Sequence, residues 1–270
     1  MPELPEVEVT RLGIAPVLTG KRATGAVCRI PALRYPLPAG LGQRLAGQVL
    51  ADVSRRGKYL LFRFGSGRLL VHLGMSGSLR LLPAGTPAAK HDHVDLLFDD
   101  TILRLTDPRR FGSLLWLPPA PAGHPLLDVL GIEPLEAGFT GQWLHAALAG
   151  RRGPIKPVLM DSHLVVGIGN IYASESLFRS GIDPRRAAGR VSRQRCERLV
   201  PAIRETLQAA VSAGGSSLRD FIGSDGEMGY FQQAYLVYGR EGEPCRSCAG
   251  AIRLLRQAGR ATYFCPHCQR

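Results

Sequence analysis

The chain has 270 residues, enough for two domains with separate cores or for one large domain. It carries 34 Lys+Arg against 22 Asp+Glu, a formal net charge of +12 with a pI near 10. This surplus favours a polyanionic partner, with nucleic acid ahead of an anionic membrane surface, over a merely soluble basic protein. No apolar run reaches the ~18 residues that a spanning helix needs, and the acidic start lacks the apolar core of a signal peptide, so we expect a cytoplasmic protein without membrane association.

Residues 6–18 predict an opening helix, because apolar side chains recur along them and prolines stand at the start. Glu3, Glu6 and Glu8 would lie at its first turn, where the helix dipole favours carboxylates. Between residues 27 and 117 the pattern changes to short β-type runs separated by Gly, Pro and Asp, which indicates an antiparallel sandwich or barrel. The predicted strands are 59–64, 69–73, 78–82, 93–98, 102–105 and 113–117.

A proline-rich segment, 118–125, predicts a linker or domain edge, since proline is excluded from sheet interiors. Helical periodicity follows at 143–148, 157–164, 171–179 and, most clearly, 195–213. The glycine-dense stretch 214–229 predicts a mobile loop.

Four cysteines near the C-terminus form two knuckles, Cys245-x₂-Cys248 and Cys265-x₂-Cys268, sixteen residues apart. This spacing is typical of a Cys₄ ribbon around one structural Zn²⁺ ion; two disulfides or free thiols are the alternative. Residues 252–263 between the knuckles predict a hairpin that carries arginines at 253, 256 and 260. We interpret Cys28 and Cys196 as buried or inert thiols, and the sequence leaves a disulfide between them open.

The start of the chain offers a nucleophile. Removal of Met1 would leave Pro2 with a secondary amine whose pKa lies near the α-amino reference of ~7.7–8. Such an amine can attack an electrophilic carbon and form an iminium. Glu3 follows directly. A terminus that is merely tolerated is the alternative.

Three other segments hold candidate nucleic-acid contacts. Lys58, beside two arginines at a strand mouth, is either a phosphate clamp or a solvated strand end. Met75 in a glycine-rich turn could be a wedge between bases, and Arg109 with Phe111 on a second turn fits insertion into an opened duplex. The alternative for Met75 is a loop residue folded back on the core, and the alternative for the second turn is a surface turn with one buried Phe.

Phosphate contacts are predicted at three further positions. His91 belongs to a His-Asp-His run without a third metal ligand nearby, so phosphate contact or solvent exposure is favoured over a metal site. Asn170 opens a predicted helix after Gly167 and Gly169, a place suited to phosphate although it lacks a dinucleotide-binding fingerprint. Arg151 extends the positive surface.

Taken together, these segments resemble one family. Residues 1–8, 57–60, 72–77, 107–112 and 169–173 and the Cys₄ ribbon occur in the order found in bacterial formamidopyrimidine-DNA glycosylases. The match spans essentially the whole chain. The related endonuclease VIII shares the Pro-Glu start but usually has glycine where this chain has Leu4, which favours the oxidised-purine branch.

The resemblance implies an α+β multidomain fold: an N-terminal antiparallel β-sandwich, a helical helix–two-turn–helix domain and a C-terminal zinc ribbon. The expected boundaries are 1–118 for the catalytic domain, 119–135 for a linker, 136–235 for the DNA-binding domain with a capping loop at 214–229, and 236–270 for the ribbon. One structural Zn²⁺ is expected, in a monomer that acts on damaged double-stranded DNA at the nucleoid.

The implied activity is bifunctional: excision of 8-oxoguanine and formamidopyrimidines, then β,δ-elimination at the abasic site through a Schiff base. Pro2 would attack the sugar C1′, Glu3 would protonate the opening sugar ring, Lys58 would assist β-elimination and Arg260 δ-elimination. The implied DNA contacts are Met75, Arg109 and Phe111 in the vacated space and His91, Arg151 and Asn170 on phosphates. A catalytically silent lesion binder and a zinc-ribbon module of a transcription assembly are the rival hypotheses.

Overall fold

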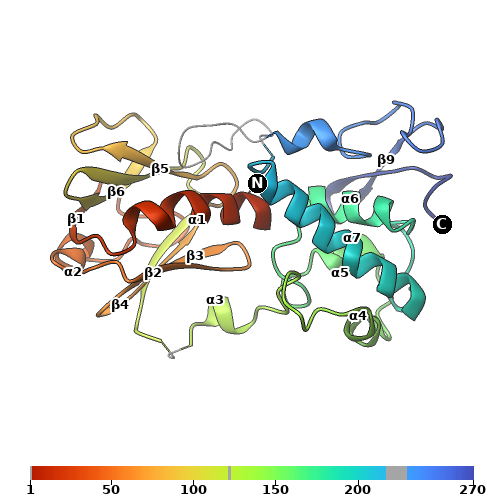
Figure 1. Cartoon of the computed structure of the whole chain (residues 1–270), viewed down its shortest axis with the longest axis horizontal. Coiled ribbons are helices and arrows are strands. Elements are labelled where there is room, and N and C mark those ends of the chain that lie inside the picture. The colour runs from red at the N-terminus through yellow and green to blue at the C-terminus, as the bar shows by residue number, and fades with distance from the viewer. Residues whose placement is uncertain (1, 121–122, 217–229) are drawn as a thin grey trace. The chain divides into compact units, whose positions relative to one another are not determined.

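The computed structural model describes residues 2–120, 123–216 and 230–270. The chain divides into two compact units (Figure 1). The first comprises Met1–Asp128 with Ala213–Tyr230, and the second comprises Val129–Ser212 with Phe231–Arg270. The predicted fold class is confirmed, because antiparallel sheets, a helical region and a C-terminal cysteine cluster are all present.

The first unit opens with helix α1, Leu4–Leu18, which begins two residues earlier than the sequence pattern predicts. The early start has a local cause: Glu3 is the N-cap, and its side chain and that of Glu6 form a capping box. The apolar face of α1 packs against strands β2 (Asp52–Arg56) and β3 (Tyr59–Phe64) and joins the core of the unit.

Eight strands of the first unit form two four-stranded antiparallel sheets, which confirms the predicted sandwich. Inward and outward side chains alternate as the pleat requires, so that Leu60, Phe62 and Phe64 enter the shared core. The sheet order in one sheet is β1 (Ala23–Cys28), β6 (Asp92–Phe98), β7 (Thr101–Thr106) and β5 (Ser78–Pro83). In the other it is β2 (Asp52–Arg56), β3 (Tyr59–Phe64), β4 (Gly67–His72) and β8 (Ser113–Leu117).

Two short helices complete the described part of the first unit: α2 (Leu41–Leu45), which packs on β1, and α3 (Pro125–Asp128). The second unit is built around the long helix α7 (Arg193–Ser212), which packs against α4 (Gly141–Leu148) and α6 (Asn170–Arg179). Helix α5 (Ile155–Leu159) lies against α6. Two 3₁₀ turns, Ala188–Arg190 and Phe231–Ala234, complete its helical part.

The predicted helix at 157–164 is wrong in its extent, because α5 ends at Leu159. The Asp161 carboxylate accepts the backbone N–H of His163, and the Asp161 carbonyl accepts that of Leu164, which turns the chain out of the helix.

The predicted ribbon hairpin is present as β9 (Arg253–Gln257) paired with β10 (Arg260–Phe264). Ala258 and Gly259 between the strands have φ of +47° and +75°, the positive pair that a tight two-residue hairpin turn requires. Arg260 therefore stands directly after the hairpin tip, with its side chain exposed.

Of the two alternatives for Cys28, a buried thiol or an inert one, burial is wrong and inertness stays a prediction. Cys28 is exposed because it ends β1, an edge strand of its sheet. Cys196 is buried on α7, and burial raises the pKa of its thiol to about 11. Both are free thiols.

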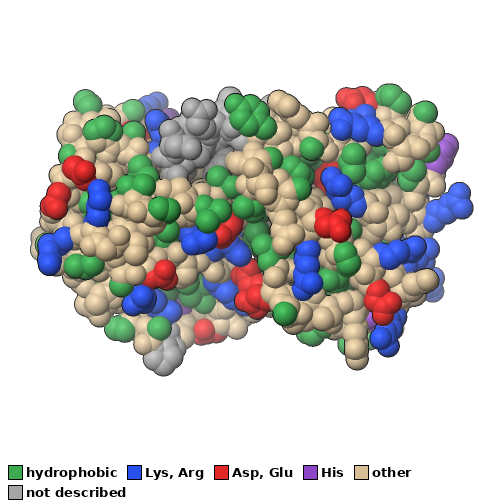
Figure 2. All heavy atoms as spheres, in the orientation of Figure 1, with side chains coloured by type: hydrophobic (Ala, Val, Ile, Leu, Met, Phe, Trp, Pro, Cys, Tyr) green, Lys and Arg blue, Asp and Glu red, His purple; other side chains and the backbone are tan. Residues whose placement is uncertain are grey.

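Within the described residues no helix is both long and apolar enough to cross a membrane. On the face drawn in Figure 2, Lys and Arg side chains alternate with Asp and Glu.

Candidate active site and metal centre

The N-terminal segment is buried and held by a carboxylate. Pro2 is buried, and the Glu3 side chain behind it is buried as well. Glu6 accepts the backbone N–H of Glu3 on Oε2 at 2.8 Å and that of Ser216 on Oε1 at 2.9 Å. Glu6 thus fixes the residue after Pro2 and joins it to the chain at position 216, so that Pro2 is presented from the start of a rigid helix.

Lys58 lies in the turn between β2 and β3, and a salt bridge connects this turn to α1. Arg55 donates from Nε to Glu8 Oε2 at 2.9 Å and from Nη1 to the carbonyl of Gly57 at 2.9 Å. Burial opposes ionisation of Glu8, but the hydrogen bonds from Arg11 and Arg55 outweigh it and lower the pKa of this carboxyl group. An ionised Glu8 therefore holds the Lys58 turn against the helix that carries Pro2.

His72, the last residue of β4, has a pKa far below its ordinary value, so its ring is neutral at pH 7. His72 pairs with Tyr59 across β3 and β4, with the ring centroids 4.9 Å apart. Burial lowers the pKa of His72 to about 4, and the charges of Lys58 and Arg34 add to this effect. Its Nδ1 accepts the backbone N–H of Gly74 at 3.0 Å, so the neutral ring carries its proton on Nε2.

The two candidate insertion turns contact each other. Met75 and Phe111 are exposed by 38% and 48%, and the Arg109 guanidinium lies 4.8 Å from the centroid of the Phe111 ring. Gly74 has φ of +64°, and a Cβ there would stand 2.5 Å from the backbone nitrogen of Gly112. The structure therefore brings Met75, Arg109 and Phe111 onto one exposed surface formed by adjacent turns. His91 is partly exposed in the loop before β6.

In the second unit a buried lysine, Lys156, bonds to the predicted site residue Asn170 and to the two residues that follow the predicted site residue Arg260. Lys156, exposed by 1%, donates from Nζ to Asn170 Oδ1 at 2.6 Å, and to Ala261 O and Thr262 Oγ1 at 2.8 Å each. The last two acceptors belong to β10, directly after Arg260. Lys156 could not be selected as a site residue from the sequence, because its hydrogen-bond partners lie 14 and more than 100 residues away along the chain.

A cavity of about 180 Å³ adjoins this cluster and is lined by Lys156 and Arg260 among others. Arg151 is exposed, and its Nε donates to the carbonyl of Ala147 at 3.0 Å. Its Nη1 lies 3.8 Å from Asp161 Oδ2. Burial opposes ionisation of Asp161, but hydrogen bonds from His163 and the charge of Arg151 lower its pKa.

The four ribbon cysteines fit one zinc ion. Their sulfur atoms all lie within 4.8 Å of one another, with Cys245 and Cys268 at 3.8 Å and Cys248 and Cys265 at 3.5 Å. Tetrahedral bonds of about 2.3 Å would separate the sulfurs by about 3.8 Å. The ligand set is the one that structural zinc prefers, and its role is to pin the hairpin that carries Arg260.

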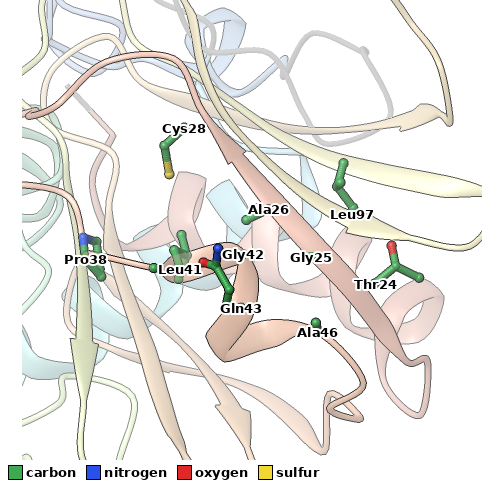
Figure 3. A pocket seen from close by; sticks show the side chains of 11 residues that line it. Thr24, Gly25, Ala26, Cys28, Pro38, Leu41, Gly42, Gln43, Ala46 and Leu97 are labelled. Carbon is green, nitrogen blue, oxygen red and sulfur yellow. The ribbon is translucent and has the colours of Figure 1, made fainter.

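The first unit also has an open hollow of about 520 Å³ between β1 and α2 (Figure 3). Its lining residues are uncharged and mostly small or apolar, with Thr24, Cys28 and Gln43 as the polar side chains. None of the predicted site residues lines it, so it plays no part in the candidate site.

Three family models match consecutive parts of the chain: the formamidopyrimidine-DNA glycosylase N-terminal domain over residues 1–114, the H2TH domain of the same enzymes over 130–222, and a zinc finger found in FPG and IleRS over 242–270. This combination with the β-sandwich and the Cys₄ cluster defines the class of DNA glycosylases that combine a helix–two-turn–helix with a zinc finger.

Full-length relatives narrow this class. Formamidopyrimidine-DNA glycosylases of Aromatoleum aromaticum and Dechloromonas aromatica are each 58% identical, over 100% of both chains. A solved FPG mutant of Lactococcus lactis in complex with a Fapy-dG-containing DNA superposes with a TM-score of 0.92 at 34% identity, covering 100% of both chains. The MutM (FPG) protein of Thermus thermophilus gives a TM-score of 0.89 at 39% identity, over 99% and 98% of the two chains.

The chain belongs to the formamidopyrimidine-DNA glycosylase family. The predicted resemblance, the class of enzyme and the structural zinc ion are thereby confirmed.

Proposed function

We propose that this enzyme removes oxidised purines from duplex DNA and then cleaves the abasic site by β,δ-elimination through a Schiff base at Pro2. Family membership supports the glycosylase activity, and solved relatives in complex with Fapy-dG-containing and abasic-site DNA indicate the substrate. The observation that carries the lyase proposal is the buried Pro2–Glu3 segment, fixed by the capping box to α1.

The chemistry follows from residues in the first unit. With Met1 removed, the Pro2 nitrogen is a secondary amine that can bond to the sugar C1′ as the damaged base leaves. Glu3, buried directly behind it, would protonate the ring oxygen as the sugar opens. Lys58, held near α1 by the Arg55–Glu8 bridge, would contact phosphate and assist β-elimination.

Arg260 and the phosphate contacts complete the proposal. Excision requires the damaged nucleotide to leave the stack, at a cost of a few kcal/mol. Met75, Arg109 and Phe111 would fill the space left behind, since their turns expose two large apolar side chains with a guanidinium beside them. Arg260, Asn170, Arg151 and His91 would hold phosphates, with Arg260 assisting δ-elimination.

Borohydride reduction tests the covalent step. Incubation with a duplex that holds one 8-oxoguanine should give a reduced protein–DNA adduct, and strand cleavage should leave phosphate at both ends of the gap. Pro2→Gly or an acetylated N-terminus should weaken or abolish the adduct, whereas Pro36→Gly, which changes a proline outside the proposed site, should not. Mass spectrometry should find Met1 absent from active protein.

Tight binding of the lesion duplex without an adduct or cleavage would contradict the proposal and favour the silent-binder hypothesis. Base release with an intact strand would remove the lyase part alone.

We also propose that the enzyme acts as a monomer at the nucleoid in the cytoplasm. Light scattering during size-exclusion chromatography should give the mass of one chain, 29.2 kDa, with and without a lesion duplex of known mass; a mass of two chains would contradict this.

A further inference from the structure

We propose that Asp107 is a positioning residue for lesion recognition: its buried carboxylate locks the Met75 turn to the Arg109–Phe111 turn so that both enter DNA as one body. The inference rests on the proposed function. Asp107 touches none of the reacting atoms in that scheme, and the sequence pattern marked it only as the first residue of the second turn.

The Asp107 side chain is completely buried and bonds to both turns. Oδ1 accepts the hydroxyl of Ser76 at 3.2 Å and the backbone N–H of Arg109 at 3.3 Å. Oδ2 accepts the backbone N–H of Gly112 at 2.8 Å. Ser76 directly follows Met75, and Gly112 directly follows Phe111. One carboxylate therefore holds Arg109 itself and the residues that directly follow Met75 and Phe111.

The Asp107 backbone extends the same connection to the histidine loop. Its N–H donates to the carbonyl of His91 at 3.0 Å, and its carbonyl accepts Nε2–H of the buried His93 at 2.9 Å. Of the four candidate DNA contacts in the first unit, His91 and Arg109 thus bond to Asp107 themselves, and Met75 and Phe111 each directly precede a residue that does.

Backbone hydrogen bonds close each turn by itself, Gly77 N–H to Leu73 O at 2.9 Å and Arg110 N–H to Asp107 O at 3.2 Å, and the Asp107 carboxylate connects one turn to the other. Neither turn belongs to a helix or strand, and Arg110 has φ of +55°, a left-handed conformation that costs energy in a non-glycine residue. Hydrogen bonds to an ionised acceptor are roughly twice as strong as neutral ones. A side chain that inserts into a duplex must oppose the stacking of bases. If the two turns moved independently, the protein would insert these side chains less well although it remained folded.

Asp107→Asn keeps the shape but has one acceptor oxygen. Its amide NH₂ must face either the N–H of Gly112 or that of Arg109, so the Arg109–Phe111 turn loses one acceptor in either orientation. We expect the single-turnover rate on an 8-oxoguanine duplex to fall about ten- to a hundredfold, the factor that corresponds to one lost hydrogen bond to a charged acceptor. Borohydride trapping on a single-stranded abasic oligonucleotide, which needs no insertion, should match the wild type.

A spectroscopic signal separates positioning from a general structural defect. With 2-aminopurine opposite the lesion, wild-type binding should raise fluorescence as the base unstacks, and Asp107→Asn should reduce this rise at saturating protein. Asp100→Asn is the matched control, because Asp100 is exposed and bonds to Lys21 on the surface; it should behave as the wild type.

The outcomes are decisive. Full duplex activity and fluorescence in folded Asp107→Asn would overturn the proposal, and so would an equal loss of single-strand trapping, because the defect would then not concern insertion. If Asp107→Asn does not fold, Ser76→Ala decides: it removes one bond to Oδ1, and an unchanged fluorescence rise would overturn the proposal. Wild-type protein that forms no adduct would instead refute the proposed lyase chemistry, and the fluorescence comparison would still test the inference.

Discussion

Replacing Lys156 by methionine should weaken the second unit and detach the hairpin of Arg260 from helix α6. The ammonium group is buried and serves three acceptors: Asn170 Oδ1, Ala261 O and Thr262 Oγ1. Methionine has a similar volume and fills the space, but it donates nothing. The variant therefore isolates the hydrogen bonds from the packing.

The magnitude follows from two opposing effects. Each acceptor left without its donor costs about 1–3 kcal/mol. Thr262 Oγ1 still donates to Gln257 Oε1 at 3.2 Å, which limits its loss, whereas Asn170 keeps the bond that its Nδ2 donates to Tyr238 at 3.2 Å but its Oδ1 loses Lys156. Removal of a buried cation also recovers a desolvation cost of several kcal/mol. We expect a net destabilisation of about 2–4 kcal/mol, within the range for breaking a buried polar network.

Urea unfolding of zinc-loaded protein, followed by circular dichroism at 222 nm, measures this change, with Lys90→Met on an exposed lysine as the control. The variant should also bind duplex DNA with a shallower salt dependence, because Asn170 and Arg260 would no longer be held together. Equal or greater stability of Lys156→Met would refute the reasoning and show that desolvation of the ammonium outweighs its three bonds.

Two further predictions concern the metal and pH. Release of zinc by a mercurial reagent should yield one ion per chain in a colorimetric assay. It should also abolish strand cleavage, because the Arg260 hairpin would no longer be held by the metal. Metal-free protein that cleaves fully would contradict the structural role of the ion. The pKa of His72 is about 4 in the folded protein against an ordinary value of 6.5. As the pH falls, the unfolded chain therefore binds a proton at this residue before the folded protein does. The stability that is present above pH 6.5 is lost as the pH falls towards 4, by about 3 kcal/mol. Urea midpoints at pH 7 and pH 5 should therefore differ less in His72→Gln than in the wild type; an identical pH dependence would contradict a buried neutral ring.

The fold was predictable where side-chain patterns are strong. Strands β3 and β8 have the predicted bounds, because apolar runs end there at turn residues. Strand β1 was missed because its sequence, ATGAVC, is small and includes a glycine, and helix α2 was missed because five residues are too few for a helical period. Both elements are stabilised by contact with each other and not by their own pattern.

For the candidate site, too, the residues that could be predicted are those that belong to a local sequence motif. Residues in contiguous motifs, such as Pro2 and Arg109, were selected from the sequence, and their roles remain proposals. Lys156 and Asp107 were not selected as site residues, because their importance lies in acceptors and donors that the fold brings from distant positions. No local pattern records such contacts, so they emerge from the geometry.

The bond between Glu6 and Ser216 has a consequence for how the protein is made. The first unit contains residues from both Met1–Asp128 and Ala213–Tyr230, so a ribosome must synthesise the whole of helix α7 before Glu6 Oε1 can receive its partner. Until then a carboxylate destined for burial stays hydrated at the start of the nascent chain. A fragment cut within the proline-rich stretch 118–125 would keep that incomplete state permanently, which makes residues 1–128 of the first unit a poor candidate for separate expression.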